Sequence, residues 1–132
     1  MQKLNLPEHK FRLKKEEDKS YIFEDFRKKY VVLTPEEWVR QNFLMHLVND
    51  LDFPKSLISV EAGLKLYKTK KRTDIVIYNK QGAPLLIVEC KAPEVSIDEK
   101  VFDQIVRYNM ALHVNYLVVT NGLNHYCCQL DY

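Results

Sequence analysis

After residue 33, apolar residues recur at every third or fourth position, which is the spacing of an α-helix. Thr34, Pro35 and Glu37 combine an N-cap threonine, a proline at the first helical position and a glutamate three residues after the cap. This pattern predicts a helix from residue 34 to about residue 51. The helix has an apolar stripe of Leu44, Leu47, Val48 and Leu51, and the same stripe reaches back to Glu37, Arg40 and Gln41.

The period changes to two in the middle of the chain. Strict alternation over residues 58–66 predicts one half-buried strand, and the basic stretch KTKKR that follows predicts a turn. Two further β-rich runs, at 73–78 and 84–92, flank a glycine-containing stretch that suits a two-residue hairpin turn at Gln81 and Gly82. A three-stranded meander is therefore expected.

The C-terminal part returns to a helix and then to strands. Ser96 and Glu99 form a second capping box, and helical spacing continues to Leu112, so a helix is predicted over about 97–112. Residues 116–120 predict a buried strand, which the type I′ turn signal Asn121-Gly122 connects to a last strand at 123–129. The whole chain, 1–132, is expected to form one domain with a core at 34–129 and an N-terminal hairpin or arm at 1–30.

Composition narrows the class of protein. Of the 132 residues, 46% are apolar and 29% are charged, as in an ordinary globular domain, and the net charge of +2 does not by itself indicate a nucleic-acid partner. The three cysteines have neither zinc-binding nor redox spacing, which favours a reducing, cytoplasmic location. No apolar run approaches the roughly 18 residues of a membrane span, so no membrane partner is expected.

The predicted hairpin brings charged residues together. A turn at Gln81 and Gly82 pairs residues whose numbers sum to 163, which places Asp74 opposite Glu89. The period of two then puts Lys91 on the same face as Glu89. Opposed carboxylates repel each other unless a cation lies between them or one is protonated. Because the cluster offers oxygen ligands without histidine, the pattern predicts Mg²⁺, or Mn²⁺, rather than zinc.

These residues carry a resemblance to a known group of nucleases. Asp74, with fourteen residues between it and the triplet Glu89-Cys90-Lys91, resembles the PD-(D/E)xK nuclease motif, with Thr73 where that motif often has proline. The segments LTPEEWVRQ, KRTDIVIY, LLIVECKAP, QIVRYN and VTNG resemble the N-terminal endonuclease domain of the restriction subunit of type I restriction enzymes. The resemblance implies an α/β, restriction-endonuclease-like fold with an α-β-β-β-α-β core, in which helices flank a mixed sheet.

The resemblance also implies roles for individual residues. Asp74, Glu89 and the backbone carbonyl of Cys90 would be metal ligands, and Lys91 would be the catalytic lysine. Gln104 and Tyr108 match the QxxxY element of that family, and Glu37 matches the first-helix glutamate of related nucleases. The chain contains no GxxxxGK[ST] phosphate loop, so a motor activity is not expected of these residues.

Several residues have an alternative role. Glu37 can serve as a helix cap alone, Gln104 can simply be exposed, and Tyr108 lies on an apolar helix stripe and can belong to the core. Arg40 can pair with Glu37 or contact a phosphate. The basic residues before Asp74 can form a solvated turn or contact DNA; they are Lys68, Lys70, Lys71 and Arg72. Glu61 is expected to be exposed.

The expected function is that of a magnesium-dependent DNA endonuclease domain that hydrolyses phosphodiester bonds in a restriction system. One alternative is a non-catalytic nucleic-acid-binding or regulatory module of the same fold, and another is a structural or protein-interaction domain. DNA is the expected partner. A motor or specificity subunit acting in trans and a second copy of the chain are further partners left open.

Overall fold

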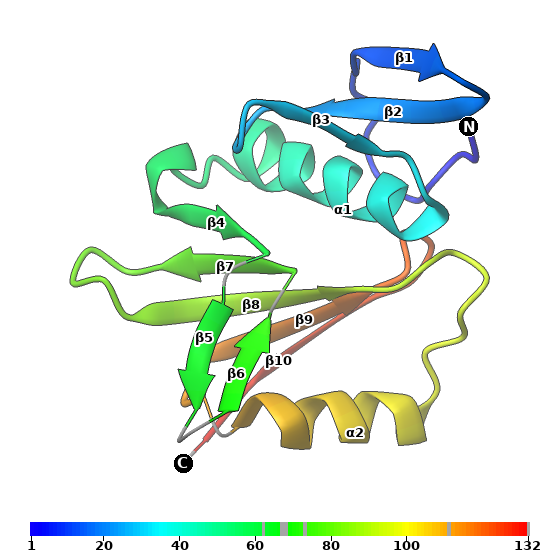
Figure 1. The fold of residues 1–132 in the computed structure, drawn as a ribbon. Coiled ribbons are helices and arrows are strands. Elements are labelled where there is room, and N and C mark those ends of the chain that lie inside the picture. The colour runs from blue at the N-terminus through cyan, green and yellow to red at the C-terminus, as the bar shows by residue number, and fades with distance from the viewer. Residues whose placement is uncertain (62, 67–68, 73, 111, 132) are drawn as a thin grey trace.

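The computed structural model describes all residues except 62, 67, 68, 73, 111 and 132, and of residues 63–66 and 69–72 it describes the backbone alone. A mixed five-stranded sheet lies between two helices (Figure 1). Its strand order is β10-β9-β8-β7-β4, in which β8 and β9 are parallel and the other neighbours are antiparallel. The strands are β4 (Ile58–Val60), β7 (Ile75–Tyr78), β8 (Pro84–Cys90), β9 (Tyr116–Thr120) and β10 (His125–Gln129). This arrangement confirms the predicted α/β core with its mixed sheet.

Helix α1 (Pro35–Met45) begins as the sequence predicts. The Thr34 side chain accepts a hydrogen bond from the Glu37 amide at 3.0 Å. The helix ends earlier than expected, because a π-helical turn at His46–Asp50 replaces its last turns and leaves Leu51 exposed. Its apolar residues pack on one face of the sheet together with Ile75, Ile77, Val88 and Cys90.

Helix α2 (Glu99–Met110) covers the other face of the sheet, where it packs against Val76, Ile87 and Leu117. The predicted Ser96 cap is wrong, because the Asp98 carboxylate accepts from the Val101 amide at 2.8 Å and the helix starts at Glu99. Both residue types are good caps, and the structure uses Asp98.

The predicted register between β7 and β8 is confirmed from Ile75 to Ile77. Ile75 pairs with Val88 and Ile77 with Leu86, so the numbers sum to 163 as expected. The turn itself is longer than two residues: a bulge at Tyr78 shifts its partner to Pro84, and the Asn79 side chain accepts amide hydrogen bonds within the loop.

The single strand predicted over residues 58–66 is wrong. It breaks after β4 at Glu61, which adopts a positive φ of 52°. Residues beyond the break form β5 (Gly63–Leu66), which pairs with β6 (Thr69–Arg72) as a separate two-stranded sheet. Most of the predicted basic turn is therefore a strand. Alternation along the sequence continues through the break, so the pattern alone could not locate it.

A three-stranded antiparallel sheet precedes α1. Its strands are β1 (Leu13–Glu16), β2 (Lys19–Glu24) and β3 (Lys29–Val32), and it packs on the outer side of α1 (Figure 1). The segment before it reaches the β9–β10 turn, where the Asn5 amide donates to the Gly122 carbonyl at 2.7 Å. In that turn only Gly122 has a positive φ, so the predicted type I′ geometry, which needs two such residues, is wrong.

No helix in the described part of the chain is long and apolar enough to cross a membrane.

Candidate active site

Asp74 directly precedes β7 and lies at the end of the sheet where β8 finishes. The β7–β8 ladder ends at the pair Ile75 and Val88, which leaves Asp74 and Glu89 as the next residues of the two strands. The carboxylate of Asp74 accepts a hydrogen bond from the backbone amide of Cys90 at 2.8 Å. Since that amide belongs to the peptide that follows Glu89, the Asp74 carboxylate lies beside the Glu89-Cys90 peptide.

Four of the predicted site residues line one hollow between β8 and α2. Glu89 and Lys91 come from the end of β8 and the residue after it, whereas Gln104 and Tyr108 come from α2. Tyr108 is 58% exposed, so it does not belong to the core. The described lining of this hollow does not include Asp74, whose carboxylate instead turns toward α1.

Arg40 holds the carboxylate of Asp74 from the α1 side. Its guanidinium donates to Asp74 at 2.7 Å and to Glu37 at 2.5 Å, and it lies 3.2 Å from a carboxylate oxygen of Glu61. Burial by itself would lower the pKa of Arg40, but the carboxylates of Asp74 and Glu37 raise it, so the guanidinium remains charged. The structure thus shows the ion pair with Glu37 that the sequence offered as one alternative; a contact between Arg40 and a phosphate remains a prediction.

Glu37 has two distinct functions at the start of α1. Its backbone amide takes part in the helix cap, but its carboxylate accepts from Arg40 and, at 2.9 Å, from Gln41. The carboxylate is therefore directed into the protein. Burial raises the pKa of Glu37, although hydrogen bonding to Gln41 and the charge of Arg40 oppose that shift.

The polar network extends from the site to the N-terminal sheet. Glu61 also accepts a hydrogen bond from Arg27 at 3.0 Å. Arg27 in turn makes a bidentate ion pair with the fully buried Glu24 at 2.6 and 2.7 Å. Glu61 is thus partly buried and ion-paired, and its predicted exposure is wrong. Neither Glu24 nor Arg27 belongs to the predicted site residues, and the only signal for them in the sequence is a charged residue beside the apolar run of β2.

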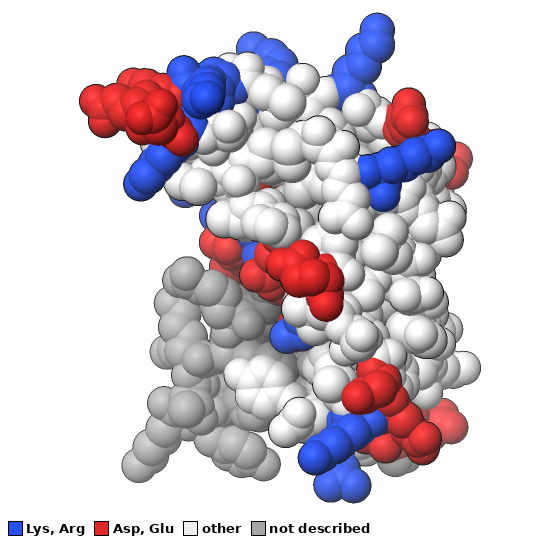
Figure 2. All heavy atoms as spheres, turned by 90° about the vertical axis from the view of Figure 1, so that its right-hand side faces the viewer, with Lys and Arg blue, Asp and Glu red and all other residues white. Residues whose placement is uncertain are grey.

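Formal charges within this network do not balance. Four carboxylates, from Glu24, Glu37, Glu61 and Asp74, face two guanidinium groups, from Arg27 and Arg40, which leaves a net charge of −2. Figure 2 shows Asp and Glu side chains gathered in a recess in the middle of one face of the molecule. An excess of buried negative charge is unfavourable unless protons or cations neutralise it.

The chemistry of the donor groups fits Mg²⁺ or Mn²⁺. Within the described residues no three His, Cys, Asp or Glu side chains are arranged to hold a metal, but Mg²⁺ is commonly bound through one or two carboxylates and several waters. Each oxygen of the Asp74 carboxylate retains lone pairs beyond its hydrogen bond. Cys90 is fully buried, and burial raises the pKa of its thiol well above the usual value, so only its backbone is a suitable hard ligand.

The basic residues before Asp74 are only partly described. Lys68 lies outside the described residues, whereas Lys70, Lys71 and Arg72 lie on β6. In β6 these three pair with Lys65, Leu64 and Gly63 of β5. Their contact with DNA remains a prediction.

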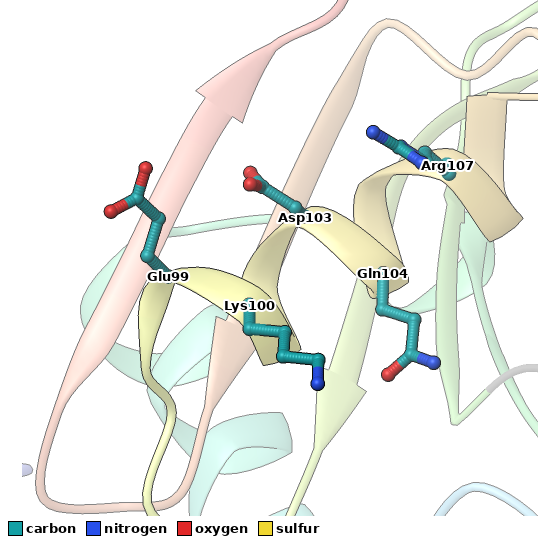
Figure 3. A pocket seen from close by; sticks show the side chains of 5 residues that line it. All are labelled: Glu99, Lys100, Asp103, Gln104 and Arg107. Carbon is teal, nitrogen blue, oxygen red and sulfur yellow. The ribbon is translucent and has the colours of Figure 1, made fainter.

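A second hollow lies along the exposed side of α2. Its described lining comes from a single helix and consists of Glu99, Lys100, Asp103, Gln104 and Arg107. Figure 3 shows Lys100 and Gln104 projecting to one side of α2 and the other three to the opposite side. The groups do not converge on a common point, but Gln104 connects this hollow with the one beside Glu89.

Comparison with known proteins agrees with the resemblance that the sequence shows. No individual curated protein matches the chain. A family model described as the type I restriction enzyme R protein N terminus matches residues 35–132, which run from the start of α1 to beyond β10 and include Asp74, Glu89 and Lys91. Because the match covers well over half of the chain, this protein belongs to the family of type I restriction enzyme R protein N-termini.

Proposed function

We propose that this chain is a metal-dependent DNA endonuclease domain of the PD-(D/E)xK type, which hydrolyses phosphodiester bonds. The observation that carries the proposal is the convergence of separate segments at one end of the sheet. Glu89 and Lys91 share a hollow with Gln104 and Tyr108, and Asp74 accepts from the Cys90 amide next to Glu89. A structural role alone does not call for an aspartate, a glutamate and a lysine at adjoining strand ends.

In this proposal the two carboxylates and the Cys90 carbonyl hold Mg²⁺ or Mn²⁺. A bound divalent ion polarises a phosphate and lowers the pKa of a coordinated water. The protein groups supply orientation: Arg40 and the Cys90 amide hold one carboxylate of the pair, that of Asp74, in a fixed position. The net charge of −2 in the adjoining network supports binding of a divalent cation at this position.

Lys91 and Gln104 are the groups proposed to position water and phosphate. Lys91 follows β8, where its amide donates to the Thr120 carbonyl at 2.8 Å, so its backbone is fixed by the sheet. A cationic donor near the scissile phosphate stabilises the charge that develops during hydrolysis. Gln104 and Tyr108 face the same hollow from α2, and in this proposal they contact the nucleic acid.

Further parts of the proposal concern partners and location. Cutting both strands of a duplex commonly uses two sites, which a second copy of the chain would supply; a motor or specificity subunit in trans is the other arrangement. The three cysteines are free of disulfides, in keeping with a cytoplasmic location.

One observation favours the alternative of a non-catalytic module of the same fold. Arg40 already neutralises Asp74 across a 2.7 Å hydrogen bond, so the site can exist without a metal. A nuclease assay separates the two functions: supercoiled plasmid, linear duplex and single-stranded DNA are incubated with Mg²⁺ or Mn²⁺. We expect cleavage by the wild type and by Lys80→Ala, an exposed loop control, and none by Lys91→Ala. Metal binding without cleavage of any substrate would support the non-catalytic module.

A further inference from the structure

The β1–β3 sheet has one face against α1 and one face directed outward. Ile22 and Glu24 of β2 are fully buried, and Glu24 lies 3.4 Å from the Gln41 side chain of α1. Residues alternate between the faces of a strand, so Tyr21 and Phe23 point to the opposite side. Phe23 is paired with Tyr30 of β3, which brings a third aromatic ring to the outer face.

Cations lie directly over these rings. The Arg12 guanidinium is 4.0 Å from the centre of the Phe23 ring, and the Lys14 ammonium is 4.4 Å from that of Tyr30 and 5.7 Å from that of Tyr21. Lys19 lies on the same face, because the register pairs it with Glu16, two residues from Lys14. Glu16 shares this face, and its carboxylate lies 3.3 Å from the Lys14 ammonium. We call this set the outer face: Arg12, Lys14, Lys19, Tyr21, Phe23 and Tyr30.

Positive charge is concentrated in this part of the chain. Residues 10–32 contain eight Lys or Arg and five Asp or Glu, a formal charge of +3, whereas the whole chain carries +2. The remaining residues therefore sum to −1. Figure 2 shows Lys and Arg side chains on the upper part of the molecule, together with Asp and Glu side chains at its edges.

We propose that the outer face binds a short stretch of single-stranded DNA. Phosphates would contact Arg12, Lys14 and Lys19, and bases would stack on Tyr30 and on the exposed side of the Arg12 guanidinium. An unstacked base can present its flat face to a tyrosine ring or a guanidinium plane, whereas a duplex offers only base edges. Three strands spaced about 4.8 Å apart give a face roughly 10 Å wide, enough for two or three bases.

The outer face is separate from the candidate active site and is formed by a different part of the chain. It lies before residue 35, outside the segment that matches the family. It is nevertheless fixed relative to the site, because Arg27, which follows β2, bonds Glu61, and Glu61 in turn contacts the Arg40 that holds Asp74. A strand bound there would be held at a constant distance from the ends of β7 and β8.

Binding can be measured by fluorescence anisotropy with a labelled oligothymidylate of about 12 nucleotides, in EDTA so that no cleavage takes place. Lys14→Ala should weaken binding several-fold and lower the slope of log K against log salt by about 0.7, the value for one phosphate contact on a single strand. Lys15→Ala is the matched control, because Lys15 is an adjacent exposed lysine whose register partner, Ser20, is on the other face. Its slope should stay nearer that of the wild type.

A second variant and its matched control test the aromatic stacking. Tyr30→Leu should weaken oligothymidylate binding about tenfold, whereas Tyr116→Leu, which removes a similarly exposed tyrosine from β9, should have no effect. Melting temperatures of all four variants confirm that each is folded. Equal losses for Lys14→Ala and Lys15→Ala, or an unchanged affinity of Tyr30→Leu, would overturn the proposal, as would equally tight binding of a duplex of the same length.

The test of oligonucleotide binding is independent of nuclease activity. Lys80→Ala, the loop control of the nuclease assay, should bind the oligonucleotide as the wild type does, since Lys80 belongs to neither the outer face nor the candidate active site. If oligonucleotide binding fails while the wild type still cuts plasmid DNA, the outer face is not a binding site and the proposed nuclease function stands.

Discussion

The Arg40 guanidinium donates to the Asp74 carboxylate at 2.7 Å, although 34 residues separate the two in the sequence. This bond connects the first helix to the strand end where the proposed metal ligands meet. It also gives Asp74 a counter-charge in the absence of any ion. The interaction is well shielded from solvent, because only 8% of the Arg40 side chain and 14% of that of Asp74 are exposed.

Removing the Arg40 charge should destabilise the fold strongly. Arg40→Gln leaves the carboxylates of Glu37 and Asp74 without their shared partner, and breaking a buried ion pair from one side costs about 3 to 5 kcal/mol. Urea unfolding measures the loss. Arg107→Gln is the control, since that arginine lies on the exposed side of α2 and should change stability by no more than about 0.5 kcal/mol. Similar losses in the two variants would show that the network contributes little.

The pH dependence of stability should report the burial of Glu37. Burial raises the pKa of Glu37 in the folded protein above its ordinary value of 4.5, so the folded state binds more protons than the unfolded state between these two values. The wild type therefore loses stability from this group as pH rises through that window. Glu37→Gln lacks that loss, and its melting temperature relative to the wild type should improve as pH increases from about 4.5.

Glu36→Gln serves as the control for that series, because Glu36 is exposed one position away on the same helix and should track the wild type at every pH. The Glu37→Gln variant should also cleave DNA at least about tenfold more slowly at fixed Mg²⁺, a barrier change of roughly 1.4 kcal/mol. Wild-type activity in Glu37→Gln would restrict this residue to a structural role.

Lys91→Ala should separate metal binding from catalysis. The lysine is proposed to act on water or phosphate, so its loss should leave the rise of melting temperature with Mg²⁺ nearly intact while cleavage disappears. Differential scanning fluorimetry at several Mg²⁺ concentrations gives the first quantity, and a plasmid assay gives the second. A lost metal response would mean that Lys91 supports the ligands rather than the chemistry.

The β5–β6 hairpin is expected to contribute phosphate contacts. Replacing both Lys70 and Lys71 by alanine should weaken duplex binding and reduce the salt dependence by about one to two units of slope, since each contact contributes roughly 0.9. Replacing Lys28 and Lys29 at the start of β3 removes the same charge from a different surface. Equal slopes for the two double variants would leave general electrostatics as the only effect.

Local patterns were sufficient to predict the framework of the site. Alternation in the two strands and a glycine turn gave the pairing of Ile75 with Val88, which makes Asp74 and Glu89 the next residues at that end of the ladder. The common face predicted for these two carboxylates is wrong, because Asp74 turns toward Arg40 of α1 whereas Glu89 lines the hollow beside α2. The turn is longer than predicted, but the register of the paired strands is the predicted one, because the bulge at Tyr78 compensates for the extra residue.

The polar network could not be predicted in the same way. Arg40 meets Glu61 only because the chain breaks after β4 at a positive φ, and Arg27 meets Glu61 only because the N-terminal sheet docks on α1. Both are tertiary events with no local period. The choice of Asp98 over Ser96 as a cap is a smaller case, since either residue can satisfy the helix start.

Binding of a divalent cation by Asp74 is the central claim, and the metal dependence of the melting temperature tests it most directly. In the wild type the melting temperature should rise with Mg²⁺ or Mn²⁺ by mass action, because the ion binds the folded state and relieves the carboxylate excess. Asp103→Asn, an exposed aspartate on α2, should respond equally. In Asp74→Asn the rise should vanish; an undiminished rise in that variant would contradict the assignment of the metal site.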